Sequence, residues 1–230
     1  MDEGLRERKK RETRQRIADM AMGLFMARGF DNVTVAEVAR AADVSVNTVF
    51  NYFKTKEDLF LDRSAMVEVM PAEVVRERAT GESVIAALRR DFLDALDTRH
   101  WRYGFGDGSD VFAKLVSDSP ALTSAMLQMH MERERALAEA LMEATDADPD
   151  DLRPWLVATQ VLNTTRVLTA HAARRMMAGE DWARIGPDIR EQAEIAFGLL
   201  ERGVGDYGAR SGAGQDEKPP SSAARPNSST

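Results

Sequence analysis

Apolar residues recur at helical spacing from the first third of the chain onward. The first clear stripe lies within residues 13–28, where apolar side chains repeat at i, i+3, i+4, i+7 and i+8: Ile17, Met20, Ala21, Leu24 and Phe25. Gly29 follows as a C-cap that ends this helix. No stretch of the sequence alternates apolar and polar residues over the length of a strand, and no long segment repeats. The pattern therefore predicts an all-α fold.

Two short helices and a tight turn follow this stripe. Thr34-Val35-Ala36-Glu37 has the capping-box pattern, in which the Thr hydroxyl caps the third amide and the Glu carboxylate reaches back. Asp43 suits a turn, because Asp tolerates the left-handed backbone conformation. Ser45 caps a second short helix that ends near Phe53, and Thr55 caps a longer one. A capped helix, a turn of about four residues and a second capped helix are the pattern of a helix-turn-helix unit.

The second helix of this unit has one side suited to packing and one suited to DNA. Val49, Phe50 and Phe53 suit packing against the preceding helices, whereas polar groups on the outer side can read base edges or contact phosphates. The candidate DNA-contacting residues are Thr34, Ser45, Val46, Asn47, Thr48, Asn51, Tyr52 and Lys56. The alternative interpretation is that the polar residues only solvate a surface helix, or that the unit is a protein-interaction module.

Longer helices are predicted after Pro71, at 83–99, about 120–144, 149–179 and 187–202. An aromatic, glycine-rich loop separates the first two, at 100–110. Ser119-Pro120, Asp148-Pro149 and Gly186-Pro187 predict three of the helix starts, since proline fits the first helical position. From Gly203 the composition is that of a disordered tail. The predicted organisation is a flexible basic arm at 1–12, a helix-turn-helix DNA-binding domain at 13–55, a helical ligand-binding and dimerisation body at 56–202, and the tail at 203–230.

The charge distribution and the composition exclude some classes of function and favour others. The 230 residues carry a net charge of −7, but residues 1–63 hold 12 basic and 11 acidic side chains and the first sixteen hold 7 and 4. The negative charge therefore lies in the body, and the basic arm can attract DNA. The chain has no cysteine, and its three histidines lie far apart. We expect no metal, no cofactor, no enzyme activity, no membrane span and a cytoplasmic location.

The run from Arg14 to Leu59 resembles the DNA-binding domain of the TetR (tetracycline-repressor) family of bacterial transcription regulators. The matching positions are the Ile17–Phe25 stripe, Gly29-Phe30, Thr34–Ala39, Val44-Ser45, Thr48-Val49-Phe50, and Tyr52-Phe53 with Lys56-Glu57 and Leu59. The resemblance implies a homodimer whose two heads bind a palindromic double-stranded DNA operator. It also implies that helices 149–179 and 187–202 form the dimer interface. It also implies a repressor that a small apolar or amphipathic effector releases from DNA.

Three positions depart from the family pattern. Asp43 stands where glycine is usual, Asn47 where glycine is frequent, and Asn51 where tyrosine or histidine is common. Asp43 fits the turn, and the two asparagines lie on the side that reads DNA. The two asparagines therefore alter which operator sequence we expect. They do not alter the expectation that the protein binds DNA.

Several residues of the body are candidates for contact with an effector. Gln160, Asn163, Thr164, Val167 and His171 lie along one stripe, and Met126, Met129 and His130 lie along another. The candidate ligand-contacting residues are Phe92, Trp101, Met126, Met129, His130, Gln160, Asn163, Val167 and His171. The alternatives are a hydrogen-bonded dimer seam or solvated edge for the first stripe, and ordinary core packing for the methionines. The competing function is a ligand-independent, DNA-anchored architectural or protein-interaction protein.

Overall fold

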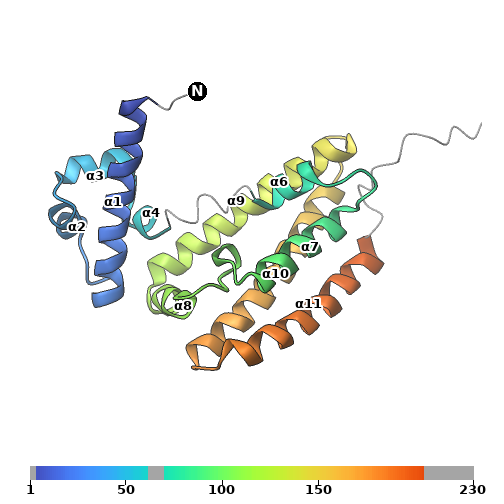
Figure 1. Cartoon of the computed structure of the whole chain (residues 1–230). Helices are drawn as coiled ribbons and strands as arrows, with labels where there is room; N and C mark the ends of the chain where they lie inside the picture. Colours follow the sequence, from blue (N-terminus) through green and yellow to red (C-terminus); the bar gives the residue numbers. More distant parts are fainter. Residues whose placement is uncertain (1–3, 62–69, 205–230) are drawn as a thin grey trace, which may run out of the picture.

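The computed structural model describes residues 4–61 and 70–204, and within these ranges it contains helices and loops but no strand. Four helices form a small N-terminal head: α1 (Leu5–Arg28), α2 (Val35–Ala41), α3 (Val46–Tyr52) and α4 (Lys56–Leu61). The body contains α6 (Met70–Glu77), α7 (Val84–Asp97), the 3-10 turn η1 (Trp101–Tyr103), α8 (Ser109–Asp118), α9 (Pro120–Thr145), α10 (Arg153–Met177) and α11 (Trp182–Val204). Figure 1 shows the head standing beside one end of the body. The predicted all-α fold is confirmed.

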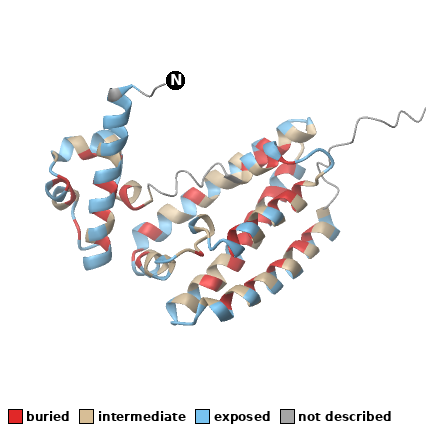
Figure 2. Cartoon of the chain, in the orientation of Figure 1, coloured by how far each residue is buried: buried red, intermediate tan, exposed pale blue. Residues whose placement is uncertain are grey.

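Each part is built around its own set of buried apolar side chains (Figure 2). In the body, Phe92 of α7 lies at the centre, with its ring 5.0 Å from that of Tyr103, 5.6 Å from Phe105 and 5.8 Å from Phe197. In the head, the rings of Phe25, Phe30 and Phe60 lie 4.9–6.2 Å apart. Aromatic pairs at these separations stabilise a core beyond the effect of burial alone.

The core of the head extends past the boundary predicted at residue 55. It takes in Phe60 of α4, Leu115 of α8 and Leu122 of α9, all of which are buried. The ring of Phe60 stacks on Phe112 with a centroid distance of 4.6 Å. The buried hydroxyl of Ser119 donates a 2.8 Å hydrogen bond to a carboxylate oxygen of Asp31. The head is thus seated on α8 and the start of α9.

The first helix begins earlier than predicted. Residues 5–12, expected to belong to a flexible arm, are the first two turns of α1. The physical reason is that leucine, arginine, lysine and glutamate all favour helix, even where no apolar stripe marks a core-facing side. Arg8 and Glu12 add an i, i+4 ion pair at 3.6 Å.

Two later helix starts also differ from the prediction. Asp148-Pro149 forms a turn, in which the Asp148 carboxylate accepts the amide of Asp150, and α10 starts only at Arg153, where Pro154 takes the early-helix position. α11 starts at Trp182, because the backbone and side-chain oxygens of Asp181 accept the first free amides of the helix. Pro187 therefore lies inside α11 instead of opening it.

Two helices of the described ranges, α6 and α8, were not predicted. α8 follows the glycine-rich loop, and its apolar residues are Val111, Phe112, Leu115 and Val116. The Ser119 cap and the α9 that follows it were predicted, and the hydroxyl of Ser119 accepts the amide of Leu122 at 3.4 Å. The tail predicted from residue 203 begins within α11, which runs to Val204, and residues 205–230 lie outside the described ranges.

Candidate nucleic-acid interface

The start of α2 is fixed by the capping box that the sequence predicts. The hydroxyl of Thr34 accepts the amide of Glu37 at 3.3 Å, and a carboxylate oxygen of Glu37 accepts the amide and the hydroxyl of Thr34, each at 2.8 Å. The other carboxylate oxygen accepts a 2.8 Å hydrogen bond from Arg28 of α1. These hydrogen bonds, those from Thr34 first, lower the pKa of Glu37 to about 2. The box thereby also joins α2 to α1.

The turn between α2 and α3 has the backbone conformation expected of it. Asp43 has a φ of +52°, in the left-handed region, and the amide of Val44 donates to the carbonyl of Ala39 at 2.9 Å. Ser45 then caps α3, because its hydroxyl oxygen accepts the amide of Thr48 at 3.0 Å and lies 2.7 Å from the Thr48 hydroxyl. The helix-turn-helix unit is therefore formed by residues 35–52.

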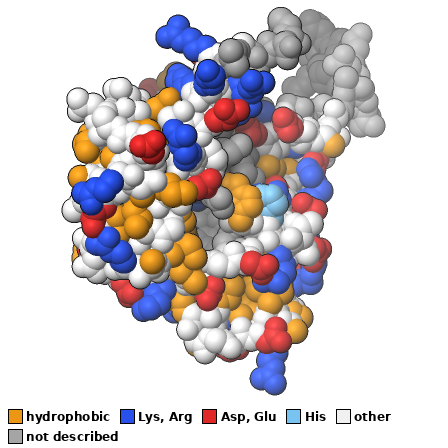
Figure 3. All heavy atoms as spheres, turned by 60° about the vertical axis from the view of Figure 1, so that its left-hand side comes forward, with side chains coloured by type: hydrophobic (Ala, Val, Ile, Leu, Met, Phe, Trp, Pro, Cys, Tyr) orange, Lys and Arg blue, Asp and Glu red, His pale blue; other side chains and the backbone are white. Residues whose placement is uncertain are grey.

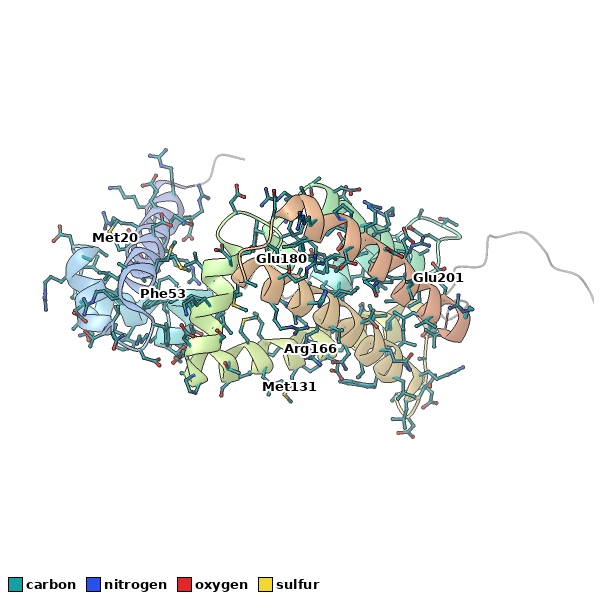
Figure 4. The ribbon with its side chains drawn as sticks, turned by 90° about the horizontal axis from the view of Figure 1, so that it is seen from below. Met20, Phe53, Met131, Arg166, Glu180 and Glu201 are labelled. Carbon is teal, nitrogen blue, oxygen red and sulfur yellow. The ribbon has the colours of Figure 1, made fainter. Side chains whose placement is uncertain are left out.

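The inner side of α3 is anchored to α1. Val49 and Phe53 are buried in the core of the head, and Figure 4 labels Phe53 there. The guanidinium of Arg14 lies 4.5 Å from the centre of the Phe53 ring and donates a 2.8 Å hydrogen bond to the carbonyl of Tyr52. These contacts fix the rotation of α3 about its axis, and so determine which residues point outward.

The outer side of α3 holds two rows of exposed side chains. Asn47 and Asn51 form one row, and Val46 and Phe50 form the other. The exposure of Phe50 corrects the prediction that it packs inward, since 48% of its surface is accessible. The cause is geometric: Phe50 is four residues after Val46 and one after Val49, so a helix that buries Val49 turns Phe50 outward.

The other predicted DNA-contacting residues surround this side. Thr34 and Ser45 are exposed, whereas Thr48, Tyr52 and Lys56 are half-buried. The ammonium group of Lys56 lies 4.2 Å from the centre of the Phe30 ring, which is a cation–π contact within the head. Lys54, which the sequence analysis did not single out, is exposed just after α3 and is a further candidate for phosphate contact.

Basic side chains also line the exposed sides of the first turns of α1. These turns extend past α3 in Figure 1, and their exposed basic residues are Arg6, Arg8, Lys9, Lys10, Arg11 and Arg16. In Figure 3, which brings the left-hand side of the molecule forward, hydrophobic patches lie between scattered basic and acidic side chains. The surface can therefore combine electrostatic attraction with apolar contact.

The predicted ligand-contacting residues do not meet at one place. Phe92 is fully buried in the core of the body, whereas Trp101 is exposed and stacks on His100 with a centroid distance of 5.7 Å. Gln160 and Val167 are exposed on α10. Asn163 accepts a 3.2 Å hydrogen bond from Arg166, and His171 lies 3.8 Å from a carboxylate oxygen of Asp188.

On α9, which packs against α10, a smaller group of the predicted residues is buried or half-buried. Met129 is buried, and Met126 and His130 are half-buried. Burial, and then the nearby charge of Arg166, lower the pKa of His130 below its ordinary value. On the same interface the hydroxyl of Thr159 donates a 2.6 Å hydrogen bond to Glu134. Arg166 of α10 is exposed, and Figure 4 labels it together with Met131, which lies at the outer edge of α9 in that view.

Among residues 4–61 and 70–204, no three or more His, Asp or Glu side chains gather as a metal site would require. No helix in the described part of the chain has the length and apolar character needed to cross a bilayer.

Comparison with known proteins adds independent information. The family model described as "Bacterial regulatory proteins, tetR family" matches residues 17–62. The HTH-type transcriptional regulator TcmR of Streptomyces glaucescens is 30% identical over 201 residues, which are 84% of this chain and 83% of TcmR.

Two solved structures have a similar fold. One is NalD, the secondary repressor of the MexAB-OprM multidrug efflux pump in Pseudomonas aeruginosa, with a TM-score of 0.56 and 17% identity over 85% of this chain and 97% of NalD. The other is a complex of SmeT with triclosan, with a TM-score of 0.54 and 14% identity over 84% of this chain and 91% of SmeT. At these identities the likeness shows the fold alone.

Proposed function

Since the chain belongs to the TetR family of bacterial regulatory proteins and is a DNA-binding transcriptional regulator, we propose that it is a repressor that binds a palindromic operator as a homodimer. A small apolar or amphipathic effector, bound by the body, releases the repressor from DNA. The observation that carries the proposal is the outer side of α3, where the inward anchoring of Val49 and Phe53 leaves Asn47 and Asn51 exposed together. Bacterial DNA lies in the cytoplasm, and we place the protein there.

Asn47 and Asn51 supply the sequence-specific contacts in this proposal. An asparagine amide can donate to N7 and accept from N6 of adenine in the major groove, which distinguishes adenine from the other bases by about 1–3 kcal/mol. The two amides are one helical turn apart, so they can reach neighbouring base pairs. Thr34, Ser45, Thr48, Tyr52, Lys54 and Lys56 surround them and hold the head on the phosphates.

The basic first turns of α1 add salt-dependent attraction. Because residues 5–12 are helical, their charges are held at fixed positions past α3. Each phosphate that a lysine or arginine neutralises releases counterions, so affinity falls steeply with salt concentration. The head therefore attracts DNA although the whole chain has a net charge of −7.

The proposed dimer interface is the outward side of α10 and α11. Leu156 and Val167 of α10, and Ile195 and Leu199 of α11, each have more than half of their surface exposed. Large apolar side chains on two adjacent helices favour coverage by a second protein surface, and in a two-fold dimer that surface is the same one on the partner. Gln160 also lies on the exposed side of α10, which supports the dimer-seam interpretation of the polar stripe over the pocket-wall interpretation.

The proposed effector site lies between α9 and α10. Met126, Met129 and His130 lie on α9, which packs against α10, and methionine side chains adapt to ligands of different shape. The structure of SmeT with triclosan shows that a protein of this fold binds a small aromatic molecule. We propose an effector of comparable character for this chain. Phe92, which is buried in the core, and Trp101, which is exposed, are not part of the proposed site.

A second candidate function is supported by one observation. Leu127 and Met131 are one helical turn apart on α9, rather than on α10 or α11, and more than 60% of each is exposed. An apolar patch outside the dimer seam favours a DNA-anchored protein that recruits another protein through its body. Two side chains cover less than the several hundred square ångströms typical of such patches, so the effector-controlled repressor is the better supported function.

Selection of bound sequences from a random DNA library tests the proposal. The purified protein is expected to enrich a palindrome, and sedimentation of the free protein is expected to show a dimer. Two half-sites with the same sequence, about one helical turn or more apart, would match two heads related by a two-fold axis. A folded dimer that enriches no sequence would contradict the proposal and favour the interaction protein.

A further inference from the structure

The outer side of α3 pairs an apolar row with a polar one. Val46 and Phe50 are one helical turn apart and are 38% and 48% exposed, respectively. Asn47 and Asn51 follow them by one residue each and are also exposed. Side chains four residues apart lie side by side on a helix, so the two rows run next to each other along the axis.

The apolar row has no role in the core of the head. Val49 and Phe53 are 1% and 2% exposed and complete the packing of α3 on α1, assisted by Arg14. Single exposed apolar residues are common and carry no meaning by themselves. Here, however, two lie in register on a seven-residue helix, beside the two asparagines that the proposed function brings to the base pairs.

The major groove contains one apolar group that these side chains can contact. Thymine has a methyl group at C5, whereas cytosine has hydrogen there, and adenine presents N6 and N7 on the opposite base of the same pair. A phenyl ring has no hydrogen-bond donor for a phosphate, so van der Waals contact is what Phe50 can offer. The row of asparagine amides can therefore contact adenine edges, and the neighbouring apolar row can contact thymine methyl groups.

We propose that Val46 and Phe50 read thymine methyl groups next to the adenines contacted by Asn47 and Asn51, with Phe50 making the larger contact. This inference rests on the proposed function, because it requires α3 to lie in the major groove. It predicts that each half-site of the selected operator contains a thymine whose methyl group contributes to binding.

Replacement of thymine by deoxyuridine tests this directly, because uracil keeps every hydrogen-bonding group of thymine and lacks only the methyl. At the critical position of one half-site, the replacement is expected to weaken binding of the wild-type protein about fourfold, which corresponds to about 0.8 kcal/mol for one buried methyl group. Replacement in both half-sites is expected to weaken binding about 16-fold. Thymines outside the half-sites serve as the DNA control.

The variant Phe50→Ala is expected to bind thymine and deoxyuridine operators with nearly equal affinity. Its ring lies outside the core, so thermal unfolding should match that of the wild type. The matched control is Asn51→Ala, which should lose preference for adenine and keep the sensitivity to deoxyuridine. A second variant, Phe50→Leu, retains an apolar side chain and should keep part of the sensitivity.

The outcomes separate this inference from the proposed function. If the wild type selects a palindrome but no single deoxyuridine replacement weakens it, or if Phe50→Ala stays as sensitive as the wild type, methyl reading by Phe50 is wrong and DNA binding stands. If the wild type binds selected and scrambled DNA alike, α3 does not read bases, and both proposals fall.

Discussion

The carboxylate of Glu37 joins two helices of the head, α1 and α2. One oxygen holds the start of α2 through Thr34, and the other holds α1 through Arg28. All of these hydrogen bonds favour the charged form of Glu37, and its pKa falls from 4.5 to about 2. Protonation of this single side chain at low pH therefore weakens the hydrogen bonds that hold the helix-turn-helix unit on α1.

The pH dependence of this contribution has a definite sign. Because the pKa of Glu37 is lower in the folded than in the unfolded protein, its stabilisation is complete above pH 4.5 and is lost as the pH falls toward about 2. Glu37→Gln keeps the side-chain shape but removes the charge. The difference in unfolding free energy between the wild type and Glu37→Gln, measured in urea, should shrink steadily over that window. A difference independent of pH would contradict the assignment.

Asn51 and Lys54 are expected to differ in how they affect binding. Asn51→Ala should reduce the preference for one base at one operator position by about 1–3 kcal/mol, because it removes a bidentate contact. Lys54→Ala should weaken binding to all sequences alike and lower the salt slope by about 1, because it removes one phosphate contact. Titrations of matched and scrambled DNA at several salt concentrations measure both. Equal effects of the two variants on both kinds of DNA would show that the outer side of α3 is misassigned.

Among the elements, those with a strong local signal were predictable from the sequence. Three helix starts carry a capping side chain that accepts a free backbone amide: Thr34 for α2, Ser45 for α3 and Ser119 for α9. The apolar stripe of α1 marks the side of that helix that faces the core. α8 was missed because glycines obscure its start, although Val111, Phe112, Leu115 and Val116 have helical spacing.

For the candidate site, the sequence predicted which residue types are present better than it predicted which side chains face outward. Asn47 and Asn51 were expected to face outward and do so. Phe50 was expected inside, because residue type suggests burial, whereas its direction depends on how α1 anchors Val49 and Phe53. For the body, sequence spacing cannot tell a pocket wall from an outer surface, since both occur on one amphipathic helix.

Pro187 provides a test at the scale of one helix. Within α11 it removes the amide that would donate to Ala183, a loss that costs about 3 kcal/mol in a helix interior relative to alanine. Proline also restricts the unfolded chain, which offsets about 1 kcal/mol. Pro187→Ala should therefore raise the unfolding free energy by about 2 kcal/mol in urea denaturation. An unchanged or lowered value would show that Pro187 does not weaken α11.

Across the whole molecule, ion pairs fasten α11 to its neighbours at both ends. Arg175 of α10 pairs with Glu180 at 2.8 Å and with Asp188, and Arg89 of α7 pairs with Glu194 and, at 3.3 Å, with Glu201. Figure 4 labels Glu180 and Glu201 near the two ends of this helix. Solvent screens such partly exposed pairs, so they orient α11 more than they stabilise it. Its apolar residues Ile195 and Leu199 are left facing outward.

The dimer interface can be tested with two equally exposed leucines. Leu199 lies on α11 and is 61% exposed, and Leu127 lies on α9 and is 62% exposed. Leu199→Glu should shift the protein from dimer to monomer in sedimentation, because it buries an unpaired charge in the interface. Leu127→Glu should leave the dimer intact. Dimers from both variants would place the interface elsewhere on the body.

Because the head packs on α8 and α9, the DNA-binding head cannot be exchanged between relatives as a single continuous segment. Because Leu115 and Leu122 complete the same core as Phe25 and Phe60, a segment cut after α4 would lack part of its own interior. A chimera meant to give a relative the DNA specificity of this chain should therefore carry residues 109–122 together with residues 1–61, or match them by compensating substitutions. The unit that can be exchanged between relatives is discontinuous in sequence, and the family model for residues 17–62 covers only its first piece.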